Sequence, residues 1–105
     1  MSSLSSPVME GLSMPQIFKL GRYLVYFWVN EGLPLEPIHV HVAAFKPQKN
    51  ATKIWITRSG NCLLCNNNSK IPPRELRYLI AAIEAYSNDI IDLWTKTFGE
   101  ISFYC

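Results

Sequence analysis

The hydrophobic pattern of this chain changes once, at Pro72-Pro73, and that change constrains the fold more than any other feature. Before it, short runs of β-forming residues alternate with turn residues. After it, apolar residues recur at three- and four-residue spacing, which is typical of an amphipathic helix. We therefore expect strands followed by one long helix over 73–98, in which Ser87-Asn88 is a weak spot that could kink or split it. Its buried side would carry Leu76, Leu79, Ile80, Ile83, Ile90 and Trp94.

The strand-like runs before the helix cover 16–20, 22–29, 38–45, 53–57 and 62–65. The turns between them, around Gly21, Pro47–Asn50 and Ser59-Gly60, are short, whereas a parallel pair needs a long crossover. The sequence therefore predicts an α+β fold, with a small, mostly antiparallel sheet of four or five strands and the helix packed on one face. Alternation over 101–105 adds a short final edge strand to this prediction.

Length and composition fit one folded domain. The chain has 105 residues, of which 49% are hydrophobic and 17% charged, enough apolar material for a single core. Residues 1–13 are rich in serine and lack periodicity, so we expect a flexible N-terminal tail and one domain over 14–105. No apolar run approaches the roughly 20 residues that cross a bilayer. The first residues lack the basic and apolar regions of a secretory signal, which predicts a cytoplasmic protein.

The tract 37–42 contains the two histidines of the sequence. Successive side chains of a strand alternate faces, so His39 and His41 share one face while Val40 and Val42 share the other. With the valines in the core, we expect the histidines to face solvent on the side of the sheet away from the helix. Two imidazoles on an open face can serve as general acid and base for phosphodiester cleavage.

A structural role is the alternative for this pair, in which the imidazoles bond loop carbonyls or pack against Trp28 or Trp55. Cleavage also needs cations that hold a phosphate, and the strands can supply them. Basic and aromatic side chains mixed on a sheet are also typical of proteins that bind single strands. For phosphate binding and for base stacking, the candidate binding residues are Arg22, Tyr26, Trp28, Lys53 and Arg58. The net charge of +2 favours ordinary core and solvated edge over nucleic acid for them.

No metal or other cofactor is expected. Two histidines supply at most half of a tetrahedral shell, and Glu31 or Glu36 would have to complete it from the preceding loop. Cys62 and Cys65 form a C-x-x-C, but residues three apart in a strand face opposite sides. No second C-x-x-C exists, and free thiols are the default for the three cysteines of a protein without an export signal.

Four parts of the sequence resemble the bacterial domain-of-unknown-function family 4160. They are the start at Met14-Pro15, the aromatic strand that leads into an acidic turn over 26–31, the Pro-x-His-x-His tract 37–41, and a helix that ends in Trp94. The family often has two prolines directly before its first histidine, whereas Ile38 intervenes here. The resemblance implies a small partner encoded beside other short proteins, in the manner of a toxin–antitoxin pair, and it implies no activity.

Two functions therefore stay open. The first is a small cytoplasmic interaction module of a toxin–antitoxin-like pair. It would bind a protein partner, with or without nucleic acid in the same complex. The second is a metal-independent ribonuclease or phosphodiesterase that uses His39 and His41. The sequence decides neither whether the chain is an enzyme nor its oligomeric state.

Overall fold

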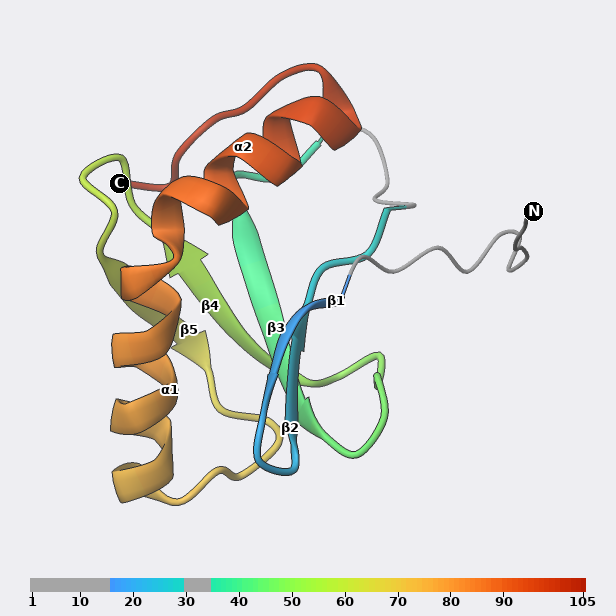
Figure 1. Cartoon of the computed structure of the whole chain (residues 1–105), viewed down its shortest axis with the longest axis vertical. Coiled ribbons are helices and arrows are strands. Elements are labelled where there is room, and N and C mark those ends of the chain that lie inside the picture. The colour runs from blue at the N-terminus through green and yellow to red at the C-terminus, as the bar shows by residue number, and fades with distance from the viewer. Residues whose placement is uncertain (1–15, 30–34) are drawn as a thin grey trace.

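The computed structural model describes residues 16–29 and 35–105 of the chain. In this part of the chain, five strands come first and two helices follow (Figure 1). The strands are β1 (Gln16–Leu20), β2 (Tyr23–Tyr26), β3 (His39–Ala44), β4 (Thr52–Ile56) and β5 (Cys62–Asn66). The helices are α1 (Pro73–Ala85) and α2 (Ser87–Phe98). The predicted tail over 1–13 lies outside the described residues.

The sheet is a meander in which each strand pairs antiparallel with the next, in the order β1-β2-β3-β4-β5. The tight turn from β1 to β2 uses a positive φ of 61° at Gly21, which glycine adopts without a Cβ clash. Short connections leave no room for a crossover, so neighbours in sequence become neighbours in the sheet. The predicted α+β class and the antiparallel sheet are confirmed.

The prediction of one long helix over 73–98 is wrong, because the helix breaks at Tyr86, where φ is −102° and ψ is 13°. A straight helix over this range would be roughly 39 Å long at 1.5 Å per residue. Strands of four to six residues measure only about 13–20 Å. The break turns α2 across the end of the sheet, so that its apolar side chains stay over the core (Figure 1).

Close packing fixes the position of the break. Ser87, the first residue of α2, is buried against the turn between β4 and β5. A Cβ on Gly60 in that turn would lie only 2.9 Å from the Ser87 Oγ, and Gly60 also has a φ of 90°. A small residue on each side is therefore needed at this contact.

The predicted final edge strand is also wrong, because residues 101–105 form no strand. The Ile38 N–H donates to the Ser102 carbonyl at 2.9 Å, and the Arg58 N–H donates to the Cys105 carbonyl at 3.1 Å. Ile38 precedes β3 and Arg58 follows β4, so the last residues run across the strand ends (Figure 1). A segment in this direction cannot add a ladder beside an edge strand.

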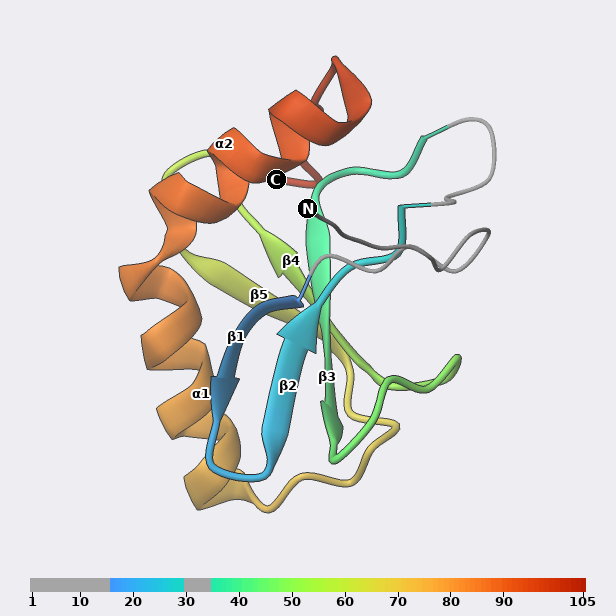
Figure 2. The same cartoon turned by 45° about the vertical axis from the view of Figure 1, so that its right-hand side comes forward.

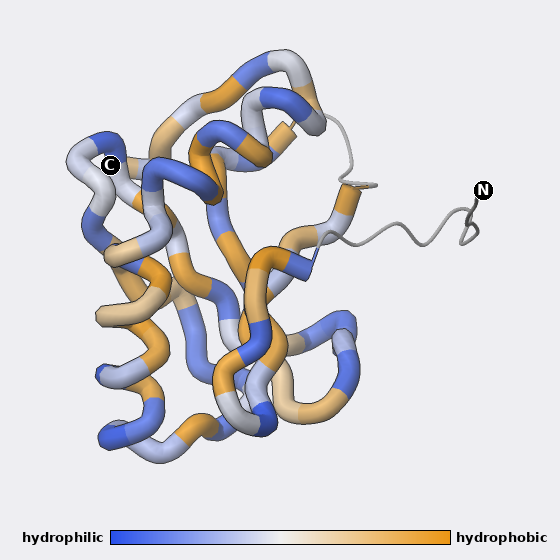
Figure 3. Tube along the Cα trace, viewed as in Figure 1, coloured by the Kyte–Doolittle hydropathy of each residue, from blue (hydrophilic) through white to orange (hydrophobic). Residues whose placement is uncertain are grey.

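One core joins both helices to the sheet, with α1 beside the strands and α2 across their ends (Figure 2). Val40 and Val42 are fully buried in this core, as the alternation along β3 predicts. The predicted helix side is confirmed in large part: Leu79, Ile83, Ile90 and Trp94 are buried, and Leu76 and Ile80 pack against the core from partly exposed positions. Hydrophobic segments line this core in both helices and the central strands (Figure 3).

Candidate functional site

The face of the sheet opposite the valines carries a row of rings that includes both histidines. His41 lies between Tyr26 on β2 and Lys53 on β4, and His39 pairs in register with Trp55. We call the residues that gather here the histidine cluster; they are Tyr26, Trp28, Glu36, His39, His41, Lys53 and Trp55. Neighbouring ring centroids lie 5.1 Å apart for the two histidines, 5.7 Å for His41 and Tyr26, and 5.8 Å for His39 and Trp55.

The histidines share a face, but the expectation that they face solvent is wrong. His39 is 1% exposed and His41 is 9% exposed. Aromatic rings from the neighbouring strands pack against both imidazoles, and Trp94 of α2 reaches His39 at a centroid distance of 5.4 Å. Alternation decides which residues share a face, whereas the size of the neighbours decides whether that face is open.

A backbone contact fixes the orientation of His39. Its Nδ1–H donates to the Pro37 carbonyl at 2.9 Å, and a carbonyl can only accept. In the neutral form of the ring, the proton therefore lies on Nδ1. This bond to a loop carbonyl is one of the contacts that the structural interpretation of the pair predicts.

The cation nearest the histidines is held within the cluster. The Lys53 ammonium forms an ion pair and hydrogen bond with Glu36, and it lies 4.4 Å from the ring centroid of Trp55. The hydrogen bond from Lys53 lowers the pKa of Glu36 below its usual value, and the nearby histidines act in the same direction. Lys53 is therefore less available to a phosphate than an unpaired surface lysine.

Two further aromatic contacts fasten the end of the cluster. The Tyr104 ring stacks on Trp55 with a centroid distance of 4.8 Å and an interplanar angle of 4°. The guanidinium of Arg58 lies 4.8 Å from the ring centroid of Phe103. The segment that crosses the strand ends thus covers Trp55, and no local sequence pattern indicates this long-range contact.

Tyr26 is a structural residue of the neighbouring loop. Its hydroxyl donates to the Gln48 carbonyl and accepts from the Gln48 N–H, both at 3.0 Å. The ring is fully buried, and burial raises the pKa of this phenol. Trp28 packs edge-on against it at 5.4 Å. No face of Tyr26 is left for a stacked base, which weighs against its predicted binding role.

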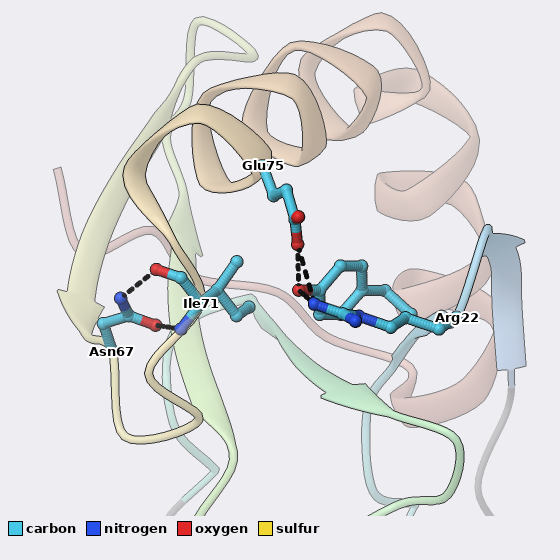
Figure 4. Close-up of polar contacts among 5 residues, drawn as sticks. Arg22, Asn67, Ile71 and Glu75 are labelled. Carbon is cyan, nitrogen blue, oxygen red and sulfur yellow. Dashed lines mark hydrogen bonds and ion pairs between the residues drawn. The ribbon is translucent and has the colours of Figure 1, made fainter.

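Arg22 lies far from the histidines, at the other end of the sheet. It follows Gly21 in the turn before β2, whereas His39 begins β3 at the opposite strand end. Its guanidinium is 3.2 Å from a Glu75 carboxylate oxygen, which also accepts from the Tyr23 hydroxyl (Figure 4). The structure therefore brings Tyr26, Trp28 and Lys53 together with the histidines and leaves Arg22 apart.

A second group of hydrogen bonds is centred on Asn67, in the connection between β5 and α1. The Asn67 side chain donates to the Ile71 carbonyl at 2.9 Å and accepts from the Ile71 N–H at 3.0 Å (Figure 4). Thr52 at the start of β4 donates to the same Asn67 oxygen at 2.7 Å. These bonds hold the entry to α1 against the sheet.

The cysteines do not join the histidines. Cys62 and Cys65 lie on β5, which β4 separates from β3. Burial and the neighbouring Glu84 raise the pKa of the Cys62 thiol to about 12, so it is a protonated, poor nucleophile at neutral pH. Within residues 16–29 and 35–105, no three His, Cys, Asp or Glu side chains gather as a metal site. Glu31, which a metal site would have needed as a further ligand, lies outside the described residues.

Fold and site together define a small α+β protein whose five-stranded antiparallel meander shares one core with two helices and whose histidine pair is enclosed by aromatic rings. Residues 23–95 match the family described as Domain of unknown function (DUF4160), and the chain belongs to this family. The predicted resemblance is therefore confirmed. No curated protein and no solved structure matches the chain.

Proposed function

We propose that this protein is a small cytoplasmic interaction module, one member of a toxin–antitoxin-like pair, and that it binds an extended segment of its protein partner along β5. The observation that carries the proposal is the uncharged, apolar edge of this strand, in which the Cys62 N–H at the start already donates to the Glu84 carboxylate at 2.9 Å. The resemblance to small proteins encoded beside other short proteins supports the pairing. Three free cysteines support a reducing compartment.

β5 is the last strand of the sheet and pairs only with β4 among the described strands. Its sequence, Cys-Leu-Leu-Cys-Asn, contains no charge and no proline, the residues that usually protect an edge from pairing. Leu63 is 41% exposed and Leu64 is 44% exposed. An unprotected edge with exposed leucines on alternate faces suits strand addition, in which main-chain hydrogen bonds give affinity and side-chain contacts give specificity.

The other edge is less suited to this role. β1 carries an exposed lysine, Lys19, and its register with β2 shifts between Gln16 and Phe18. An edge lysine opposes the addition of a further strand, whereas the register shift does not separate the two edges, because β5 also shifts against β4 between Lys53 and Ile54. The two edges therefore differ in charge, and β5 is the uncharged one.

The test is co-expression of a tagged form of this protein with the product of the short reading frame next to its gene, followed by co-purification. We expect a complex with the parent protein and loss of that complex with Leu64→Lys, which places a charge on the edge. Tyr86→Lys is the matched control, since it adds the same charge at an exposed aromatic residue away from β5. A complex that survives Leu64→Lys, or that both variants weaken equally, contradicts the proposal.

The ribonuclease alternative stays a prediction, and the burial of both imidazoles weighs against it. A general acid or base must come within hydrogen-bond reach of its substrate. The test is RNA cleavage in the presence of a chelator by the parent, His39→Ala and His41→Ala. Equal cleavage by all three proteins would end this alternative.

A further inference from the structure

Charge is distributed unevenly over this molecule, although the net charge of the chain is only +2. Seven of the ten lysines and arginines lie at one end of the sheet, and all seven are exposed. We call this set the basic pole. It consists of Lys19, Arg22, Lys46, Lys49, Lys70, Arg74 and Arg77. Among the described carboxylates, only Glu75 lies at this end.

The topology explains why cations distant in the sequence converge. In an antiparallel meander, the turns after β1, β3 and β5 all lie at the same end of the sheet (Figure 2). Backbone contacts tie these turns together: the Phe45 N–H donates to the Arg22 carbonyl at 2.8 Å. The Ser69 hydroxyl donates to the Val42 carbonyl at 2.9 Å. The first turns of α1 begin beside them.

The remaining described charges lie toward the opposite end or along the flanks of the fold. They comprise three cations, Lys53, Arg58 and Lys96, and five carboxylates, Glu36, Glu84, Asp89, Asp92 and Glu100. Lys53 is already paired with Glu36. A polyanion is therefore attracted to the basic pole and repelled elsewhere, and the small net charge conceals this asymmetry.

Two exposed rings stand among the cations of the basic pole. Phe45 is 77% exposed at the end of β3, and Tyr78 is 66% exposed on α1. A hollow of about 490 Å³ lies beside Tyr78, lined by Leu20, Gly21, Arg22, Tyr23, Glu75, Tyr78 and Leu79. Exposed rings interleaved with cations are what a nucleic-acid strand recognises through its bases and its phosphates.

The backbone holds Phe45 in an unfavourable conformation that exposes its ring. Its φ is 69°, and the Lys46 N–H donates to the Ala44 carbonyl at 2.7 Å, which makes a tight turn centred on Phe45. A bulky residue at positive φ is strained, and glycine would adopt this turn freely. The Tyr26 hydroxyl fixes the same loop at Gln48. The backbone under this ring is thus fixed while the ring itself stands in solvent, which lowers the cost of ordering the loop on binding.

We propose that the basic pole binds single-stranded nucleic acid, with phosphates along Lys46, Lys49, Arg74 and Arg77 and a base stacked on Phe45. Flat bases of a single strand are accessible to exposed rings, whereas those of a duplex are stacked internally. A lipid surface is a less suitable ligand, because stable attachment of a protein to a bilayer needs a strong apolar anchor in addition to basic residues, and a single exposed ring is a weak apolar anchor. This site is separate from the β5 edge, so it stands independently of the partner proposed above.

The test measures the fluorescence anisotropy of labelled oligo(U) and oligo(dT), about 15 nucleotides long, over a range of salt concentrations. Lys49→Glu should weaken binding about fivefold to tenfold at roughly 50 mM salt and reduce the log–log salt slope by about 0.7. Lys96→Glu, which makes the same change of charge on α2, is the matched control and should change the affinity less than twofold.

Phe45→Gly separates stacking from structure. Glycine relieves the positive φ, so the melting temperature should rise, while affinity should fall at least about fivefold without a change of the salt slope. A lower melting temperature would mean that Phe45 has a structural role.

Three results would overturn the proposal. One is the absence of measurable binding at low salt. Another is an equal loss with Lys49→Glu and Lys96→Glu, which would indicate net charge alone. The last is equal binding of the parent to vesicles of anionic lipid, with the same loss on Phe45→Gly, which would indicate a lipid surface instead.

Discussion

The histidine cluster and the basic pole differ in whether their polar groups bond to one another or face solvent. In the cluster, His39 bonds the Pro37 carbonyl, Lys53 pairs with Glu36, and aromatic rings enclose both histidines. At the basic pole, seven cations share one carboxylate, and rings stand in solvent. Groups that satisfy one another stabilise the fold, whereas groups left without internal partners are the ones that a ligand can reach. The comparison predicts that changes in the cluster alter stability and changes at the pole alter binding.

The largest effect should come from Trp94, which joins the cluster to the core. Trp94 is fully buried and packs on His39, Phe27 and Phe98. Trp94→Ala should lower the free energy of unfolding by about 3–5 kcal/mol, measured by urea denaturation. Trp94→Phe is the control and should cost less, because the indole N–H has no acceptor among the described residues. An unchanged midpoint for Trp94→Ala would mean that α2 does not pack as described.

His39 gives the sharpest division between a structural and a catalytic pair. His39→Gln should lower the free energy of unfolding by about 1–3 kcal/mol, since it disturbs a buried hydrogen bond and three ring contacts. Thermal and urea denaturation measure this loss. A variant as stable as the parent would contradict the structural role of His39 and would favour a catalytic role for the histidine pair.

A smaller effect, dependent on pH, is expected at Glu36. Folding lowers the pKa of this carboxyl below the unfolded value of about 4.3, so its ion pair stabilises the protein above that pH. The contribution disappears as the pH falls through the lowered pKa. Because Glu36 is partly exposed, we expect Glu36→Gln to cost at most about 1 kcal/mol at neutral pH and nothing in strong acid. Equal differences at both pH values would contradict the pairing.

The smallest effect on stability should come from the pole itself. Lys49 is exposed in the loop between β3 and β4, and Lys49→Glu should change the free energy of unfolding by no more than about 0.5 kcal/mol. The same protein should lose nucleic-acid affinity as described above. A Lys49→Glu variant that unfolds more easily but binds nucleic acid as well as the parent does would show that Lys49 contributes to stability rather than to binding.

The sequence predicted what local periodicity controls. Turn residues predicted the antiparallel meander, and alternation along β3 predicted that Val40 and Val42 lie in the core with the histidines together on the other face. The burial of His39 depends instead on Trp94 and on the rings across the sheet. Contacts between distant residues leave no mark in local periodicity, so they could not be predicted from it.

The position of the helix break and the basic pole could not be predicted from the sequence, for related reasons. Apolar spacing continues in phase from Ile83 to Ile90 through Tyr86, and only the weak helix formers Ser87 and Asn88 mark a point where the helix could split. The short strands, and the contact of Ser87 with Gly60, decide where the axis turns. The cations of the pole are scattered from residue 19 to residue 77, and only the topology collects them. Of the predicted binding residues, Arg22 alone belongs to the pole.

The segment across the strand ends has a consequence for the order in which this protein folds during its synthesis. The meander joins residues close in sequence, and such local contacts form early as the chain emerges. The bonds from Ile38 to Ser102 and from Arg58 to Cys105 must wait until residues 102–105 have been made. Until then, one face of Trp55 lacks its Tyr104 cover. The aromatic end of the nascent protein is therefore exposed until the segment that crosses it has been made.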